Sequence, residues 1–409
     1  MTTIKALMGA TAICAAGAVS AADLEVTHWW TSGGEAAAVA EFAKAFNATE
    51  HNWVDGAIAG SGGTARPIII SRIIGGEPMG ATQLNHGRQA EELVEAGLML
   101  DLTDIAEAEG WADIVNPKRL LDACTLDGRV YCVPVNIHSP QWLWLSHDAF
   151  AKAGVDVPSD WFEFVAAAPA LEKAGLVPLA MGQQSWQTEL AFNAIMVAIG
   201  GTDLYLDVLT NKNAEAAAGE KMTAVFEAYD GARKLSVGSN VNDWNQATNL
   251  VITGQAGGQI HGDWAQGEFQ VAEQVAGEDY TCLPGLGVNE IIATGGDAFY
   301  FPLNDDPEIE EAQKALASLL ISKEVQVAFN LKKGSLPIRG DIDLSAANDC
   351  MKKGLKILAD GNVLPDGVNT FSQDTQTQIQ SLMTEFWNDH SMTVETVQAS
   401  YAKIIASAD

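Results

Sequence analysis

Positively charged residues are scarce in this sequence. The chain of 409 residues contains 23 lysines and arginines against 53 aspartates and glutamates, which gives a formal net charge of −30 at pH 7. The acidic residues are spread along the chain rather than gathered in a tail. Nucleic acids and anionic membranes bind clusters of Lys and Arg. The charge balance therefore argues against both as partners, and we attribute most of the acidity to solubility.

Long apolar runs are also missing, except for one at the N-terminus. Lys5 precedes an apolar run from Ala6 to Val19, and the small residues 20–22 follow it. This order is typical of a secretory signal peptide that is cleaved after the small residues. No other run approaches the roughly 20 residues that cross a bilayer. We predict an exported, water-soluble mature protein rather than a lipoprotein anchored through Cys14.

Cysteines are few, and none has the spacing of a metal site. The sequence contains neither Cys-x-x-Cys nor His-x-x-x-His, which argues against a structural zinc site. Four cysteines remain after the signal peptide, and an even number in an oxidising compartment indicates disulfides. A hairpin with the three-residue loop 127–129 would place Cys124 opposite Cys132. That leaves Cys282 to pair with Cys350.

Signatures of enzymes are missing as well. The sequence has no Gly-x-Ser-x-Gly elbow and no metal-ligand helix. One enzyme class is still a hypothesis, an exported glycoside hydrolase. Glu35 with Asp263 or Asp297 could supply the two carboxylates that lie about 5 to 10 Å apart in glycosidases. Acidic residues are so plentiful that such a pair is weak evidence. We predict that the protein has no cofactor or metal and is not an enzyme.

Strand-like and helix-like stretches alternate near the start of the mature chain. Residues 24–30 alternate like a strand, and residues 35–49 have helical spacing after a glycine turn. A second strand is predicted within 53–60, a helix within 64–78 and a third strand within 80–87. This alternation predicts an α/β fold with a parallel sheet flanked by helices. Ligands of such open sheets bind beyond the carboxyl ends of the strands.

Tryptophan is unusually frequent, with 11 residues against 6 tyrosines. Several lie in polar, loop-like stretches: HWWTSGG, QSWQTE, NDWNQA and HGDWAQGE. Trp29 and Trp30 are adjacent in a predicted strand, so their side chains point to opposite faces and cannot fill the same core. An indole has a flat apolar face and one N–H donor, which suits a sugar ring. We expect core packing instead for Trp53, Trp111, Trp161 and Trp387.

Six longer motifs follow one another along the chain. They are WWTSGGE, GSGGTARPIIISRIIGGEP with the strand ATQL, GRVYCVPVNIHS, GQIHGDWAQGEF, ATGGDAFYFP and ALASLLISKEVQVAFNLKKGSLPIR. In this order and spacing, the mature chain resembles the family 1 extracellular solute-binding proteins of sugar ABC transporters. More narrowly, it resembles the glucose/mannose-type periplasmic binding proteins. The last motif is the most specific, since a helix pair ending in Lys-Gly-Ser-x-Pro before a hinge is typical of this group.

The resemblance implies a two-lobed periplasmic binding protein fold of type II-like topology, with three hinge crossings and a ligand cleft between the lobes. Such lobes close about a hinge when ligand binds. We place the crossings near residues 133–136, 292–296 and 334–339, which are rich in Gly, Pro or Asn. The predicted domains are a signal peptide (1–22), an N-terminal lobe (23–134 plus 294–335) and a C-terminal lobe (135–293 plus 336–409).

The resemblance also implies which residues contact the sugar. His138 fits a structural role equally well, Asn85 is an alternative to its neighbours in the third-strand loop, and Lys332 is the solvated alternative to Lys333. The LNHG stretch and Asp297 depart from the family pattern and could change the specificity. The implied contacts are Trp29, Trp30, Glu35, Gln83, His86, His138, Trp244, Asp263, Trp264, Asp297 and Lys333.

The implied function is the periplasmic substrate-binding component of an ABC importer. It would be a monomer that delivers a monosaccharide, glucose first, to membrane permease subunits, with the ATPase on a separate chain. A disaccharide, a glycosyl-polyol or a polyamine remains an alternative ligand for the same fold. An acidic cleft would suit a polyamine, whereas Lys333 beside tryptophans suits a neutral hydroxylated ring.

Overall fold

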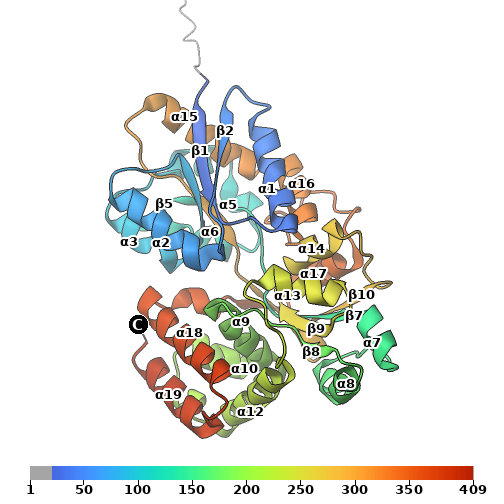
Figure 1. Cartoon of the computed structure of the whole chain (residues 1–409). Helices are drawn as coiled ribbons and strands as arrows, with labels where there is room; N and C mark the ends of the chain where they lie inside the picture. Colours follow the sequence, from blue (N-terminus) through green and yellow to red (C-terminus); the bar gives the residue numbers. More distant parts are fainter. Residues whose placement is uncertain (1–20, 409) are drawn as a thin grey trace, which may run out of the picture.

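The computed structural model describes residues 21–408, and Figure 1 shows two α/β units joined by several connections. Because residues 1–20 lie outside the described residues, the predicted signal peptide stays a prediction. In the first sheet, one strand runs antiparallel to its two neighbours and the other four are parallel, which confirms the predicted α/β class. The strand order is β2 (Asn52–Ala57), β1 (Asp23–His28), β3 (Ala81–Asn85), β12 (Asp297–Tyr300) and β6 (Cys132–Pro134).

Helices from both ends of the first unit's sequence pack around this sheet. Figure 1 shows the blue helices of the N-terminal segment beside the orange α15 and α16, although more than 200 residues separate them. These helices are α1 (Gly33–Phe46), α2 (Ser61–Ile74), η1 (Arg88–Ala90), α3 (Glu91–Glu95), α4 (Thr103–Ala108), α5 (Trp111–Ile114), α6 (Arg119–Asp122), α15 (Pro307–Leu320) and α16 (Lys323–Lys333). The hairpin of β4 (Thr125–Leu126) and β5 (Arg129–Val130) completes the unit.

The second unit is built on a smaller, mixed sheet. Its strand order is β10 (Tyr280–Pro284), β7 (Trp142–Ser146), β9 (Ala256–His261) and β8 (Val177–Leu179). A separate parallel pair joins β11 (Ile292–Thr294) to β13 (Val363–Pro365). The helices of the second half are α7 (His147–Ala153), α8 (Trp161–Lys173), α9 (Ser185–Ile195), η2 (Met196–Gly200), α10 (Gly201–Tyr205), η3 (Leu206–Thr210), α11 (Ala214–Ala217), α12 (Glu220–Leu235), α13 (Trp244–Ile252), α14 (Ala265–Val271), η4 (Gly285–Gly287), α17 (Asp349–Ala359), η5 (Gly367–Thr370), α18 (Gln373–Asn388) and α19 (Val394–Ala406).

The predicted alternation of strand and helix is confirmed from β1 to β3, with one informative difference at the first strand. β1 ends at His28, so Trp29 and Trp30 lie in the connection to α1 rather than in the strand. Ser32 ends this connection as the N-cap of α1, because its side chain accepts a hydrogen bond from the amide of Glu35. The connection is therefore short, and it holds both tryptophans at the edge of the sheet.

The three segments predicted as hinge crossings meet in the structure. Ile137, just after β6, pairs with Leu336 across an isolated bridge, and His138 pairs in the same way with Gly295. The amide of Val135 also donates to the carbonyl of Asp297 at 3.0 Å. The crossings therefore lie side by side and hydrogen-bond to one another. The exact lobe boundaries stay a prediction.

One helical stretch is more apolar than the sequence reading allowed. Residues Ser185–Thr210 are long and apolar enough to cross a membrane by length and composition. This stretch is α9 continued through η2, α10 and η3, and 61% of its most apolar window is buried inside the protein. Its side chains pack with α12 and α18. It therefore behaves as a core helix of the second unit.

The tryptophans assigned to the core are packed as predicted. Trp111, Trp161 and Trp387 are buried, and the half-buried Trp53 packs against the first core.

The two units also touch where α1 meets α14. A Cβ atom on Gly34 would lie 2.4 Å from the backbone of Gly267, so only glycine allows these helices to approach so closely.

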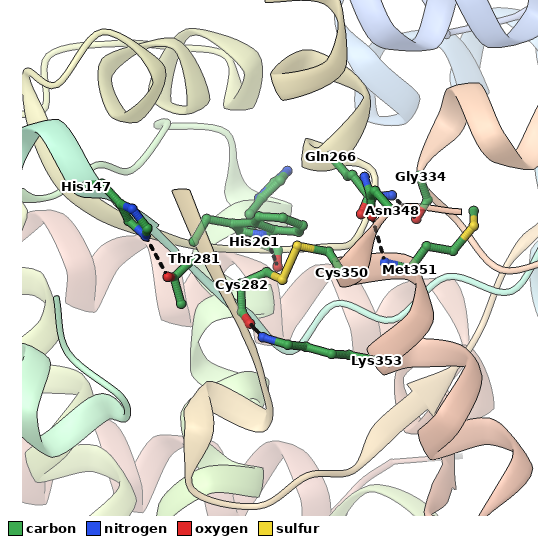
Figure 2. The surroundings of a disulfide bond; sticks show 11 residues. His147, His261, Gln266, Thr281, Cys282, Gly334, Asn348, Cys350, Met351 and Lys353 are labelled. Atoms are coloured by element: carbon green, nitrogen blue, oxygen red, sulfur yellow. Dashed lines mark hydrogen bonds between the residues drawn. A yellow bond between two sulfur atoms is a disulfide. The ribbon is translucent and has the colours of Figure 1, made fainter. Parts of the chain in front are cut away.

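Both predicted cysteine pairs lie at disulfide distance in the structure. Cys124 and Cys132 are paired beside the β4–β5 hairpin as predicted, but the predicted three-residue loop 127–129 is wrong, because Leu126 pairs with Arg129 and leaves a loop of two residues, 127–128. Cys132 therefore lies one residue beyond the position opposite Cys124. Figure 2 shows the second pair, Cys282 with Cys350, which ties β10 to α17. The ammonium of Lys353, one turn further along α17, donates to the carbonyl of Cys282 at 2.8 Å. This pair therefore fixes a late helix onto the second sheet.

Replacing Cys282 and Cys350 by serine is expected to destabilise the protein more than replacing Cys124 and Cys132. The pairs close loops with sequence separations of 68 and 8 residues, for which the chain-entropy account gives about 4 and about 2.5 kcal/mol. Denaturant unfolding of the two double variants measures both losses. An equal loss, or a larger loss for the short loop, would contradict this expectation.

Candidate functional site

A cleft with a cavity of about 200 Å³ lies between the two units, next to the crossings. β12 runs antiparallel to β3, so its first residue lies at the edge of the sheet where β1 and β3 end. The cleft is therefore lined by the carboxyl-end loops of the first sheet, as expected for an open α/β sheet. Eight of the predicted contact residues line it: Trp29, Trp30, Glu35, His138, Trp244, Trp264, Asp297 and Lys333.

Three predicted contacts lie behind this lining instead. Gln83 is buried, where its amide nitrogen donates to Asp297 at 2.9 Å and its oxygen accepts from the amide of Trp29 at 3.1 Å. His86 is buried, and burial lowers its pKa to about 4. Asp263 is buried against His138. Asn85, the alternative in the third-strand loop, does line the cleft.

Glu35 and Lys333 form an ion pair at one end of the cleft. The ammonium of Lys333 donates to Oε1 of Glu35 at 2.6 Å, and both side chains are at least nine-tenths buried. Ser32, the N-cap of α1, donates to the other oxygen of Glu35 at 3.2 Å. Lys333 ends α16, whereas its neighbour Lys332 is exposed. Removing either partner would leave a buried charge uncompensated.

His138 bridges the two units through two carboxylates. Its Nδ1 lies 2.8 Å from Asp263, which follows β9, and its Nε2 lies 2.7 Å from Asp297 at the start of β12. Burial lowers the pKa of His138, but the two carboxylates outweigh burial and raise it to about 9. The same contact holds the pKa of Asp297 well below its usual range, although burial acts in the opposite direction. At neutral pH the group is therefore an imidazolium between two carboxylates.

The adjacent tryptophans have different environments. Trp30 is 1% exposed and packs in an aromatic cluster with Phe42, Phe299 and Phe329. Trp29 is only partly buried, so its ring is the more accessible of the two in the cleft. One tryptophan therefore fills the core of the first unit, and the other presents an aromatic face to the cavity.

The second unit contributes further aromatic rings around His261. This histidine stacks on Trp244 with ring centroids 5.1 Å apart, and its Nε2 lies 2.7 Å from Nε1 of Trp264. Burial lowers the pKa of His261 to about 3, so the ring is neutral and can accept from the indole N–H. Trp264 in turn meets the ring of His138 edge-on at 4.8 Å. His261 thereby orients two cleft tryptophans.

Sequence reasoning missed the part of the cleft that comes from α2, α9, α18 and the residue before η5, which we call its distal half. Its residues are far apart in the sequence, and only the QSWQTE stretch had been noted, as a polar setting for a tryptophan. Within the described residues, no group of three or more His, Cys, Asp or Glu side chains is arranged to hold a metal ion. The missed lining residues are Ser61, Gly62, Arg66, Gln89, Pro140, Gln141, Trp186, Glu189, Leu190, Asn193, Tyr205, Gly296, Asp366, Gln376 and Gln380.

Comparison with known proteins gives matches over most of the chain. Residues 30–327 match the family described as bacterial extracellular solute-binding protein. A "probable sugar-binding periplasmic protein" of Rhizobium meliloti (strain 1021) is 36% identical over 367 residues, which cover 88% of this chain and 86% of that protein.

Solved structures with the same architecture include two sugar-binding proteins. A "chitin oligosaccharide binding protein" superimposes with a TM-score of 0.78 at 17% identity, covering 95% of this chain and 99% of its own. The maltose-bound MalE3 of T. maritima superimposes with a TM-score of 0.75 at 19% identity, covering 95% and 100%. At these identities the likeness establishes the two-lobed fold.

The stability of the protein is expected to depend on pH through His138. Its pKa is raised from an ordinary value near 6.5 to about 9 in the folded protein, so the protonated ring stabilises the fold fully below pH 6.5. This contribution, on the order of 3 kcal/mol, is lost as the pH rises through about 9. Unfolding free energies of the wild type and His138→Gln between pH 6 and 9.5 should therefore converge at the alkaline end.

A control variant, His147→Gln, removes a histidine that contacts Thr281 outside the cleft. It should keep the pH profile of the wild type. If the difference between the wild type and His138→Gln does not change with pH, His138 is not the ionised bridge described above.

Proposed function

The chain belongs to the bacterial extracellular solute-binding proteins, and from this premise we propose that it binds a monosaccharide in its cleft and delivers it to the membrane permease of an ABC importer. The relatives and the fold are those of exported transporter binding proteins rather than of enzymes. Consistent with this, Glu35 and Asp297, two carboxylates of the rival hydrolase hypothesis, are each bound to a cation.

The observation that carries the proposal is the combination of aromatic faces and ordered polar groups in one cleft. Trp29 comes from the first unit, and Trp264 comes from the second. Glu35, Lys333 and Asp297 place carboxylate and ammonium groups beside these rings. Sugar hydroxyls both donate and accept, so they need mixed polar partners, while the apolar face of the ring stacks on an indole.

The size and charge of the cleft favour one ring over the alternative ligands. The cavity of about 200 Å³ is smaller than the roughly 300–1,000 Å³ that is typical of sites for drug-sized ligands. This favours a monosaccharide over a disaccharide or a glycosyl-polyol. His138 and Lys333 already occupy the carboxylates of Asp297 and Glu35, and Arg66 adds a positive charge to the lining, which opposes a polyamine. Glucose is the first ring to test because of the resemblance to glucose/mannose-type proteins.

The remaining parts of the proposal concern the protein's context. We propose that residues 1–22 are a cleaved signal peptide and that the mature protein acts in the periplasm as a monomer. It would present both lobes to the permease, and the ATPase would be a separate chain. Closure of the lobes on the sugar would be the signal that the permease recognises.

Intrinsic tryptophan fluorescence of the mature protein is expected to change saturably with one monosaccharide at micromolar concentration. The chain has eleven tryptophans, and four of them line the cavity in addition to the buried Trp30. Their fluorescence should therefore report binding. The titration uses glucose, galactose, mannose, xylose, maltose and spermidine. A response to maltose or spermidine alone would contradict the proposed ligand and favour the disaccharide or the polyamine.

Replacing Trp29 by alanine is expected to raise the dissociation constant about 30-fold, because truncating a central tryptophan anchor commonly costs about 2 kcal/mol. Trp53→Ala is the matched control, since Trp53 is partly buried against the same core but lies outside the cleft. Calorimetric titration measures both variants with the sugar selected by fluorescence. An unchanged affinity for Trp29→Ala would remove this ring from the site.

A further inference from the structure

Arg66 lies in the distal half of the cleft, on the second turn of α2. Its guanidinium carbon is 5.6 Å from the centre of the Trp29 ring. Gly62, one turn earlier, makes room for it, because a Cβ atom there would lie 2.7 Å from Nη2 of Arg66. The guanidinium is thus placed between an aromatic ring and the cavity that holds the proposed ligand.

Arg66 has no polar partner within the described part of the chain. Its Nε is buried and no acceptor reaches it, and no hydrogen bond or ion pair to its guanidinium is formed. Arg72, two turns further along the same helix, shows the ordinary alternative. Its two terminal nitrogens donate to both oxygens of Glu25 at 2.7 and 2.8 Å. A buried donor without an acceptor is costly, so the lack of a partner at Arg66 needs an explanation.

The other two cationic groups of the lining are already neutralised. Lys333 is paired with Glu35, and His138 lies between Asp297 and Asp263. Arg66 feels the charge of Asp297, but the bond of that carboxylate to His138 is direct, at 2.7 Å. In the part of the cleft around Lys333 and His138, which we call its proximal half, each cationic group is therefore paired with a carboxylate.

Of the two carboxyl groups of the distal half, Glu189 acts electrostatically on Arg66 but forms no hydrogen bond with it. Burial raises the pKa of Glu189 to about 8, so this side chain is mostly uncharged at neutral pH. It accepts a hydrogen bond from the amide of Gln380 at 2.8 Å. The charge of Asp366 acts on Arg119, where it opposes the lowering of the pKa by burial. Among the described lining residues, Arg66 is thus the cationic group without a direct ionic partner.

An anionic group on the ligand would give Arg66 the hydrogen-bond acceptors and the direct ionic partner that it lacks. A guanidinium presents a planar fork of donors that matches the two oxygens of a carboxylate, and such charge-assisted pairs are among the strongest hydrogen bonds in proteins. A hydroxyl supplies one acceptor and leaves the charge uncompensated. The acidic outer surface opposes an anion only weakly, because exposed charges are screened beyond about 8 Å at physiological salt.

We propose that the cleft takes a sugar that carries a carboxylate, a hexuronate, and that Arg66 binds this carboxylate while the ring lies against Trp29. This inference rests on the proposed function, because it assumes that a single sugar ring occupies the cleft. It narrows the ligand from neutral hexoses to their acids. The protonated Glu189 then offers an O–H donor near the same group.

Isothermal titration calorimetry of the ligand-free mature protein at pH 7 compares each acid with its parent sugar. The probes are D-glucuronate, D-galacturonate and D-mannuronate against D-glucose, D-galactose and D-mannose. One hexuronate is expected to bind at least tenfold more tightly than its parent hexose. A hexose that binds as tightly as its acid, or more tightly, would overturn the role of Arg66 and leave the proposed function standing. If no sugar of either kind binds, the proposed function fails and this inference fails with it.

Variants of residues on α2 test whether the preference for the hexuronate depends on Arg66. Arg66→Gln should lower hexuronate affinity at least tenfold and abolish the preference for the acid. Arg66→Lys keeps the charge without the fork, so it should retain part of the preference. Arg72→Gln is the matched control on the same helix and should bind like the wild type. A preference that survives in folded Arg66→Gln would overturn the proposal. If that variant does not fold, as judged by its thermal unfolding, the wild-type comparison and Arg66→Lys decide.

Discussion

The imidazolium of His138, held between two carboxylates, is the interaction on which the arrangement of the cleft depends. His138 follows the first predicted crossing, Asp297 begins a strand of the first sheet, and Asp263 follows a strand of the second. The three segments are far apart in the sequence, yet one charged ring joins them. Each carboxylate is fixed further: Asp297 also accepts from Gln83 and Asn136, and Asp263 accepts from Ser139. The ion pairs of His138 therefore fix the positions of the strand ends that line the cleft.

Several residues predicted to touch the sugar lie one layer behind the cleft lining, because they hold His138 and Trp29 in place. Gln83 links the backbone of Trp29 to Asp297, and Asp263 orients His138. Their types match a sugar site, since amides and carboxylates serve both for ligand contact and for positioning. A pattern in the sequence cannot separate the two roles, because they differ only in which side of the lining the side chain occupies. A residue that contacts the ligand and a residue that positions its neighbour can therefore be of the same type at the same place in the sequence.

Much of the first unit could be predicted from the sequence, because its strands and helices alternate with clear periodicity and its ligand loops follow the strands. The pairing of Cys124 with Cys132 was predicted from a hairpin in the sequence, although the loop has two residues rather than the predicted three. The distal half of the cleft was not predictable. Glu189 and Gln380 meet because α9 packs against α18, which is 191 residues away in the sequence. Nor does the sequence near Arg66 show that its guanidinium lacks an acceptor, since that depends on everything packed around it.

The contact between α1 and α14 connects one end of the cleft to the second unit. Glu268 of α14 accepts a hydrogen bond from the amide of Gly34 at 2.7 Å, at the start of the helix that carries Glu35. A carboxylate at this position also complements the dipole of the helix. The ion pair of Glu35 with Lys333 is thus supported from the second unit, and the proximal end of the cleft is ordered by contacts from both.

The most direct test of the account is a crystal structure of the mature protein with the sugar that binds most tightly. We expect one ring in the cleft, in contact with Trp29 from one unit and Trp264 from the other, with hydroxyls on Asp297 and the Glu35–Lys333 pair. A ligand that lies outside this cleft, or that leaves both tryptophans uncovered, would contradict it.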